Sequence, residues 1–101
     1  MLRRMIRESL SASGADRIAT RAYVFGSCAR SKAPNDIDVL LVYCPSSTSD
    51  YLVATAFRHA LFCYCVSVFG VPAHVTLLTV TEEAEARFAV QESAVLVWPD
   101  G

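Results

Sequence analysis

Charged residues, glycine and proline are all scarce in this sequence of 101 residues. Charged residues make up 19% of the chain, and there are four glycines and four prolines. Disordered chains are usually rich in charge and poor in apolar residues, whereas 53% of this chain is hydrophobic, slightly above the usual range. We therefore expect one folded domain over residues 1–101, with some of its apolar surface covered by a partner.

The sequence also lacks the paired cysteines that bind zinc or form redox-active disulfides. Its four cysteines, Cys28, Cys44, Cys63 and Cys65, form no C-x-x-C pair. Cys63 and Cys65 are two residues apart in a helical segment, so they point to different faces and cannot hold one ion together. Free thiols are typical of a reducing compartment, and we expect a cytoplasmic protein.

No signal peptide, repeat or low-complexity segment is evident. Residues 60–80 are strongly apolar, but Gly70 and Pro72 interrupt them, and Arg58 and His59 precede them. This pattern predicts a helix followed by a strand rather than a membrane-spanning helix, and no association with a membrane.

Apolar periodicity predicts alternating helices and strands. Strands are predicted at residues 20–25, 36–43, 71–80 and 94–98, and helices at 2–12, 50–69 and 81–92, with one helical turn at 28–30. The helix at 50–69 is apolar on most faces, which predicts a central position, and Thr81 is expected to cap the helix at 81–92. Strands separated by helices indicate a two-layer α+β domain, with helices packed against a small mixed sheet of three or four strands.

Two acidic residues, Asp36 and Asp38, open the most apolar of these strands. Being two residues apart on a strand, their side chains share a face, about 7 Å apart along the backbone. Burying even one unpaired charge is costly, and a divalent cation such as Mg²⁺ would offset that cost, because it prefers carboxylate and phosphate oxygens. The alternative is that both acids lie in solvent at the end of the strand, as residues of a turn.

A glycine-serine turn precedes the acids. Gly26 ends one strand and permits a positive φ or a close approach of the backbone. Ser27 adds a hydroxyl beside backbone N–H groups that can bind an anion, and Arg30 and Lys32 would add positive charge near a polyphosphate. A phosphate on the turn and a metal on the acids would complement each other.

The sequences GSCARS at residues 26–31 and DID at residues 36–38 together resemble the signature of the minimal nucleotidyltransferases of the DNA polymerase β superfamily. The resemblance covers residues 20 to about 80. It implies that Gly26, Ser27 and Arg30 bind a nucleoside triphosphate, with ATP the expected one. It also implies that Asp36 and Asp38 are catalytic and hold Mg²⁺ or Mn²⁺ in a polymerase β-like nucleotidyltransferase fold.

The reaction implied by the resemblance is attack by a hydroxyl on the α-phosphate of the nucleotide, with pyrophosphate leaving. The acceptor would be a protein, an RNA or a small molecule. Minimal nucleotidyltransferases often pair with a separately encoded helical protein, some in toxin–antitoxin modules. Such a partner or a second copy of this chain is expected here. The aromatic residues lack the spacing of a base-stacking platform, so the sequence gives no positive sign of direct nucleic-acid binding and leaves that question open.

The sequence departs from the family pattern at three points. Ser31 replaces a glycine, the loop between the two motifs is short at eight residues, and His74 stands where the family has a third carboxylate. Histidine is a poor Mg²⁺ ligand, but it can act as a general base. Two alternatives therefore remain beside the enzyme: a catalytically degenerate domain that binds a nucleotide or a partner, and a domain that binds no ligand.

Overall fold

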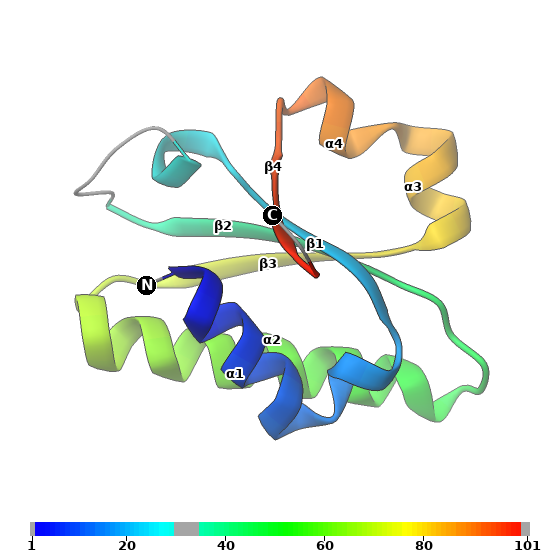
Figure 1. Ribbon diagram of the computed structural model, residues 1–101, viewed down its shortest axis with the longest axis horizontal. Helices are drawn as coiled ribbons and strands as arrows, with labels where there is room; N and C mark the ends of the chain where they lie inside the picture. The colour runs from blue at the N-terminus through cyan, green and yellow to red at the C-terminus, as the bar shows by residue number, and fades with distance from the viewer. Residues whose placement is uncertain (1, 30–34, 100–101) are drawn as a thin grey trace.

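The computed structural model describes residues 2–29 and 35–99, and its four strands form a single mixed sheet (Figure 1). The strands are β1 (Ala19–Phe25), β2 (Ile37–Tyr43), β3 (Ala73–Thr79) and β4 (Val95–Trp98), in the order β3-β2-β1-β4. β1 pairs antiparallel with β2 and β4, whereas β2 and β3 are parallel. The predicted mixed sheet is confirmed, while the polymerase β-like topology stays a prediction.

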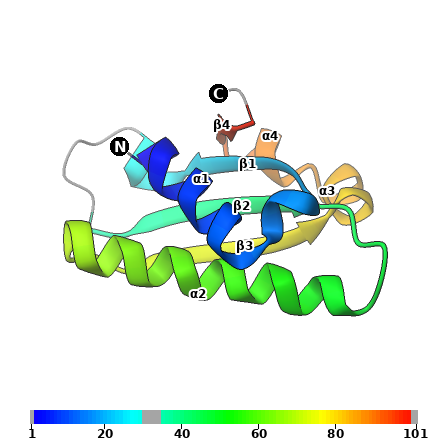
Figure 2. The ribbon, with the colours of Figure 1, turned by 60° about the horizontal axis from the view of Figure 1, so that its bottom comes forward.

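Two helices, α1 (Leu2–Ser13) and α2 (Ser49–Phe69), pack against one face of the sheet (Figure 2). The apolar side of α1 buries Met5, Ile6 and Leu10 in the core. Because successive side chains of a strand point to opposite faces, the alternate β2 residues Ile37 and Val39 meet these helices. The remaining short helices are η1 (Ala15–Arg17), η2 (Gly26–Ala29), α3 (Val80–Ala86) and α4 (Phe88–Gln91).

The long helix α2 forms where the sequence predicts it, but it is not central. Only one side of it is buried, through Ala54, Phe57, Leu61 and Cys65. In a two-layer domain the sheet covers one side of a helix and nothing covers the other, so the apolar residues of the second side stay exposed. By length and composition alone, α2 would also satisfy the requirements of a membrane-spanning helix.

The helix predicted at residues 81–92 is divided into α3 and α4, and its cap is Thr79 rather than Thr81. The Thr79 hydroxyl accepts a hydrogen bond from the Glu82 N–H (3.1 Å), and the Glu82 carboxylate accepts one from the Thr79 N–H (2.9 Å). Arg87 breaks the helix with a φ of 53°. The buried Glu83 carboxylate stabilises the break, because it accepts hydrogen bonds from the N–H groups of Phe88 (3.1 Å) and Ala89 (3.3 Å).

Candidate functional site

The parallel pairing of β2 with β3 places Asp38 directly beside His74. Ile37 and Val39, the neighbours of Asp38 along β2, point into the core beneath the helices. Asp38 and His74 therefore lie on the opposite face of the sheet. Asp36 immediately precedes β2, and like Asp38 it is partly exposed, while His74 is exposed. The structure thus brings together all three residues that the sequence predicted to be catalytic.

The two carboxylates lie close enough to influence each other. Partial burial raises the pKa of Asp38, and the negative charge of Asp36 raises it further, whereas His74 lowers it. The carboxylate of Asp38 is therefore in an environment that disfavours its charge, and a cation near it would remove that penalty. This is the electrostatic situation expected for a pair of carboxylates that bind a metal ion.

The glycine-serine turn lies against the same carboxylate. Gly26 has a φ of 70°, and a Cβ atom added to it would lie 2.7 Å from the Asp38 Oδ2 atom. Any side chain at position 26 would therefore be strained by the backbone and would also collide with Asp38. The turn forms as η2, beginning two residues earlier than the predicted helical turn at 28–30, and the Ser27 side chain is exposed.

Cys28 ties this turn to β2, a role that sequence reasoning did not foresee. Its thiol donates a hydrogen bond to the Phe25 carbonyl oxygen (3.0 Å), and its sulfur accepts one from the Asp38 N–H (3.3 Å). Burial raises the pKa of Cys28 and keeps the group a thiol. No pattern around Cys28 in the sequence announces this contact, since it depends on how the turn folds back on the strand.

Other predicted contributors are not part of the described site. Arg30 and Lys32 lie outside the described residues. The carboxylates of Glu82 and Glu83 accept hydrogen bonds within the α3 and α4 region and are not part of the site. All four cysteines are free, as predicted.

The donor set at this site is small. Within residues 2–29 and 35–99, no group of three His, Cys, Asp or Glu side chains is placed to hold a metal ion. Asp36 and Asp38 supply hard oxygen ligands that suit Mg²⁺ or Mn²⁺, but an octahedral ion would need most of its ligands from elsewhere. The residues present therefore fit a cation that arrives with a phosphate ligand better than a permanently bound one.

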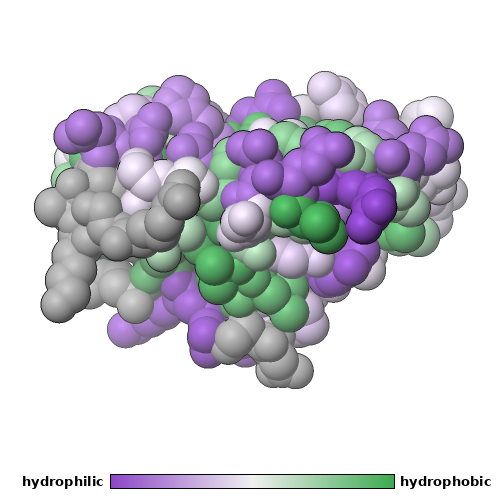
Figure 3. All heavy atoms as spheres, turned by 90° about the horizontal axis from the view of Figure 1, so that it is seen from above, coloured by the Kyte–Doolittle hydropathy of each residue, from purple (hydrophilic) through white to green (hydrophobic). Residues whose placement is uncertain are grey.

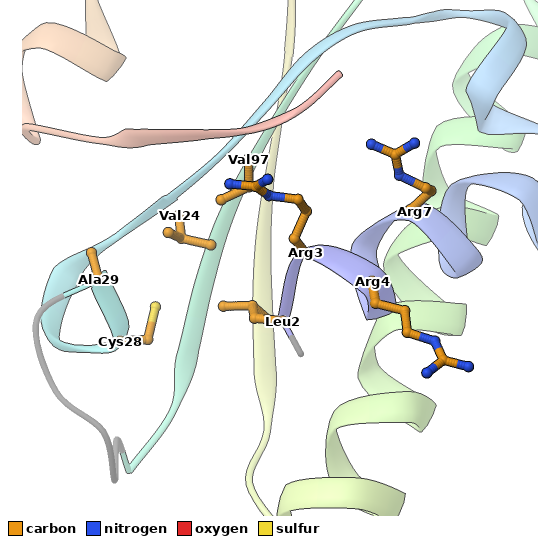
Figure 4. Close-up of a pocket in the computed structure, with 8 residues that line it drawn as sticks. All are labelled: Leu2, Arg3, Arg4, Arg7, Val24, Cys28, Ala29 and Val97. Carbon is orange, nitrogen blue, oxygen red and sulfur yellow. The ribbon is translucent and has the colours of Figure 1, made fainter. Parts of the chain in front are cut away.

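A pocket of about 650 Å³ lies on the other face of the sheet, between the start of α1 and η2 (Figure 4). Its floor is formed by the apolar side chains of Leu2, Val24 and Val97. Both Arg3 and Arg4 border the pocket; in Figure 4 Arg4 points away from the apolar residues, and it donates a hydrogen bond to Glu8. Because Val24 faces the helices and Asp38 does not, this pocket is separate from the carboxylate site.

Comparisons of this chain with protein-family models, with curated proteins and with solved structures give no match.

Proposed function

We propose that this protein is a Mg²⁺-dependent nucleotidyltransferase that transfers a nucleotide from a nucleoside triphosphate, with ATP the expected donor, to a hydroxyl group of a protein, RNA or small molecule. The observation that carries the proposal is the contact between the Gly26 turn and the Asp38 carboxylate. A phosphate bound on this turn would lie beside the acids, so one cation could bind both. Together with the sequence resemblance, this juxtaposition supports nucleotide chemistry over a chance pair of turn acids.

The residues have distinct roles in the proposed reaction. Asp36 and Asp38 would hold the cation, and when bound it would neutralise charge on the phosphates and stabilise the attacking and leaving oxygens. The Ser27 side chain is exposed, and its hydroxyl would donate a hydrogen bond to a phosphate oxygen. Cys28 fixes the distance between the turn and β2, so that the phosphate and the carboxylates keep their relative positions.

His74 is the proposed general base for the acceptor hydroxyl. It is exposed and lies beside Asp38, whose negative charge would stabilise the imidazolium formed when His74 takes the proton. A catalytically degenerate nucleotide-binding domain is the second candidate function. It is favoured by the absence of a third metal-binding side chain among residues 2–29 and 35–99.

Nucleotide binding is tested first, by isothermal titration calorimetry with ATP in the presence of Mg²⁺ and in the presence of EDTA. We expect binding only with the cation, and loss of binding in Asp36→Asn and Asp38→Asn. Glu85→Gln is the matched control, because Glu85 is an exposed acid on α3, away from the site. If the wild-type protein releases no heat with any of the four nucleoside triphosphates, both candidate functions are wrong.

Transfer is tested next, with α-³²P-labelled nucleoside triphosphates and three acceptors: the protein itself, total RNA and any copurifying protein. Label on an acceptor that disappears in His74→Ala supports the enzyme and the role of His74 as a base. A His74→Asp variant that gains transfer, where the wild-type protein binds ATP without transferring it, identifies a degenerate site.

A further inference from the structure

The outer side of α2 carries large apolar side chains at the spacing of a helix-packing seam. Intervals of three and four residues separate Leu52, Thr55, His59, Phe62, Val66 and Phe69; we call these six residues the α2 stripe. Four of them are large and apolar, and Thr55 and His59 are polar. Leu52 is 67% exposed, and the exposed fractions of Phe62, Val66 and Phe69 lie between 42% and 45%. By contrast, the surface around α3 and α4 mixes polar and apolar side chains in small areas (Figure 3).

The α2 stripe borders the free edge of the sheet. A hollow of about 350 Å³ lies between them and is lined by Thr55, Arg58, His59 and Phe62 of α2 and by Ala73 of β3. β3 is the last strand on this side of the sheet, and Figure 2 shows α2 running along it. The stripe and the strand edge therefore form one continuous surface.

The edge of β3 is open for pairing. The Ile37 N–H donates a hydrogen bond to the Pro72 carbonyl oxygen (3.0 Å). This bond shows which residues of β3 direct their backbone N–H and C=O groups toward β2. Alternate residues then direct their backbone groups outward, so the N–H groups of Val75 and Leu77 point away from β2. Natural edge strands usually carry charges or proline that prevent pairing with other chains, but residues 73–79 contain no Asp, Glu, Lys, Arg or Pro.

We propose that the α2 stripe and the β3 edge form a two-fold interface between two copies of this chain. An antiparallel pair of β3 strands would join the two sheets into one of eight strands. The same two-fold axis would lay the two α2 helices antiparallel on one side of that sheet. Each surface would then meet its own copy, as a two-fold interface requires.

The area of the surface explains why both parts are needed. A fully exposed aromatic side chain presents about 200 Å², so the exposed fractions of the stripe amount to on the order of 400 Å² of apolar side chain. A stable interface takes about 800 Å² from each partner. The apolar side chains of the stripe alone fall short of this area, so a two-fold interface needs the adjoining β3 edge and Arg58 as well.

A lipid bilayer is a poorer occupant of this surface. Arg58 and His59 lie near the middle of α2, where hydrocarbon would have to accept a charge. A bilayer would also leave the outward N–H groups of β3 without partners. A second copy of the chain would both pair with the outward N–H groups of β3 and cover the α2 stripe.

The test is the mass of the full chain by analytical ultracentrifugation between 1 and 200 μM. We expect the mass of a dimer, and at least a 100-fold weaker dimer for Phe62→Glu and for Leu52→Glu, the more exposed of the two. Val90→Glu is the matched control, because Val90 is 68% exposed on α4 and lies outside the surface; it should remain a dimer. Circular dichroism confirms that each variant is folded.

Amide hydrogen exchange gives an independent readout of the strand edge. The N–H groups of Val75 and Leu77 should be protected in the wild-type protein and in Val90→Glu, and exchange rapidly in Leu52→Glu. A wild-type monomer at 200 μM overturns the proposal, as does a mass that keeps rising with concentration, or flotation of the protein with phosphatidylcholine–phosphatidylserine vesicles. Asp38→Asn should still dimerise, so this test stands or fails independently of the proposed transferase activity.

Discussion

Glu82 and Glu83 at the start of α3 and Asp36 and Asp38 at the start of β2 are two closely spaced pairs of acids. The glutamates are used by the fold, since their carboxylates accept hydrogen bonds from the backbone N–H groups of Thr79, Phe88 and Ala89. In residues 2–29 and 35–99, no hydrogen bond to the carboxylate of Asp36 or Asp38 is found.

The difference shows how to tell structural acids from candidate functional ones. A carboxylate bonded to backbone N–H groups stabilises the element that presents them. Asp38 instead has a raised pKa, from burial and from the charge of Asp36, and its charge opposes folding. Acids that weaken the fold are retained most easily where a ligand neutralises them.

The sharpest way to separate the two pairs is Asp38→Asn. If Asp38 holds the cation, this change should lower nucleotide transfer by at least about 100-fold, since even the outer partners of metal ligands typically matter 10- to 100-fold. The fold should not be weakened, because a penalised charge is removed. Initial rates with labelled ATP and thermal melts of the same samples measure both effects, and a variant that transfers normally would refute the role of Asp38.

Glu83→Ala should have the opposite effects, lowering the stability of the fold while leaving ATP binding intact. The change leaves two part-buried N–H groups without an acceptor, so we expect the free energy of unfolding to fall by about 2 kcal/mol. Below the melting temperature, ATP binding should persist. Urea denaturation followed by fluorescence of Trp98 measures the loss, and Glu82→Ala, which removes an exposed cap, should cost less, about 1 kcal/mol.

Gly26→Ala tests how tightly the turn is packed against Asp38. Gly70→Ala is a matched control, because Gly70 has the same φ of 70° but no atom within 4 Å of an added Cβ. Both variants should lose about 1 kcal/mol from backbone strain. Only Gly26→Ala should also displace the Asp38 carboxylate and weaken ATP binding, as measured by calorimetry; equal binding in the two variants would contradict the close approach.

The smallest expected effect is on the pH dependence of stability. Because the pKa of Asp38 is raised in the fold, Asp38 contributes stability below its unfolded pKa, and this contribution is lost as pH rises through the folded value. Asp38→Asn should therefore melt higher than the wild-type protein at pH 7, and the difference should shrink on acidification toward pH 4. With ATP and Mg²⁺ present at pH 7, the difference should reverse, because only the wild-type protein gains from the bound cation.

Much of the fold was predictable because its signals are local. The apolar run of residues 39–43 and the long apolar segment that became α2 indicate a strand and a helix from the sequence alone. The division between α3 and α4 was missed, since it depends on where the Glu83 carboxylate finds its hydrogen-bond donors. The exposed side of α2 was missed as well, because composition does not say how many layers will cover a helix.

The candidate site also combines features that the sequence predicts with contacts that only the folded structure creates. The sequence by itself determined the glycine at the turn, the two acids at the start of a strand and their order along the chain, since these follow from residue type and position; the structure begins that strand after Asp36 rather than at it. Only the tertiary structure decided that His74 lies beside Asp38, that Gly26 approaches the Asp38 carboxylate and that Cys28 joins the turn to β2. These contacts depend on strand register and on how one strand packs against the next, which arise from residues far apart in the chain.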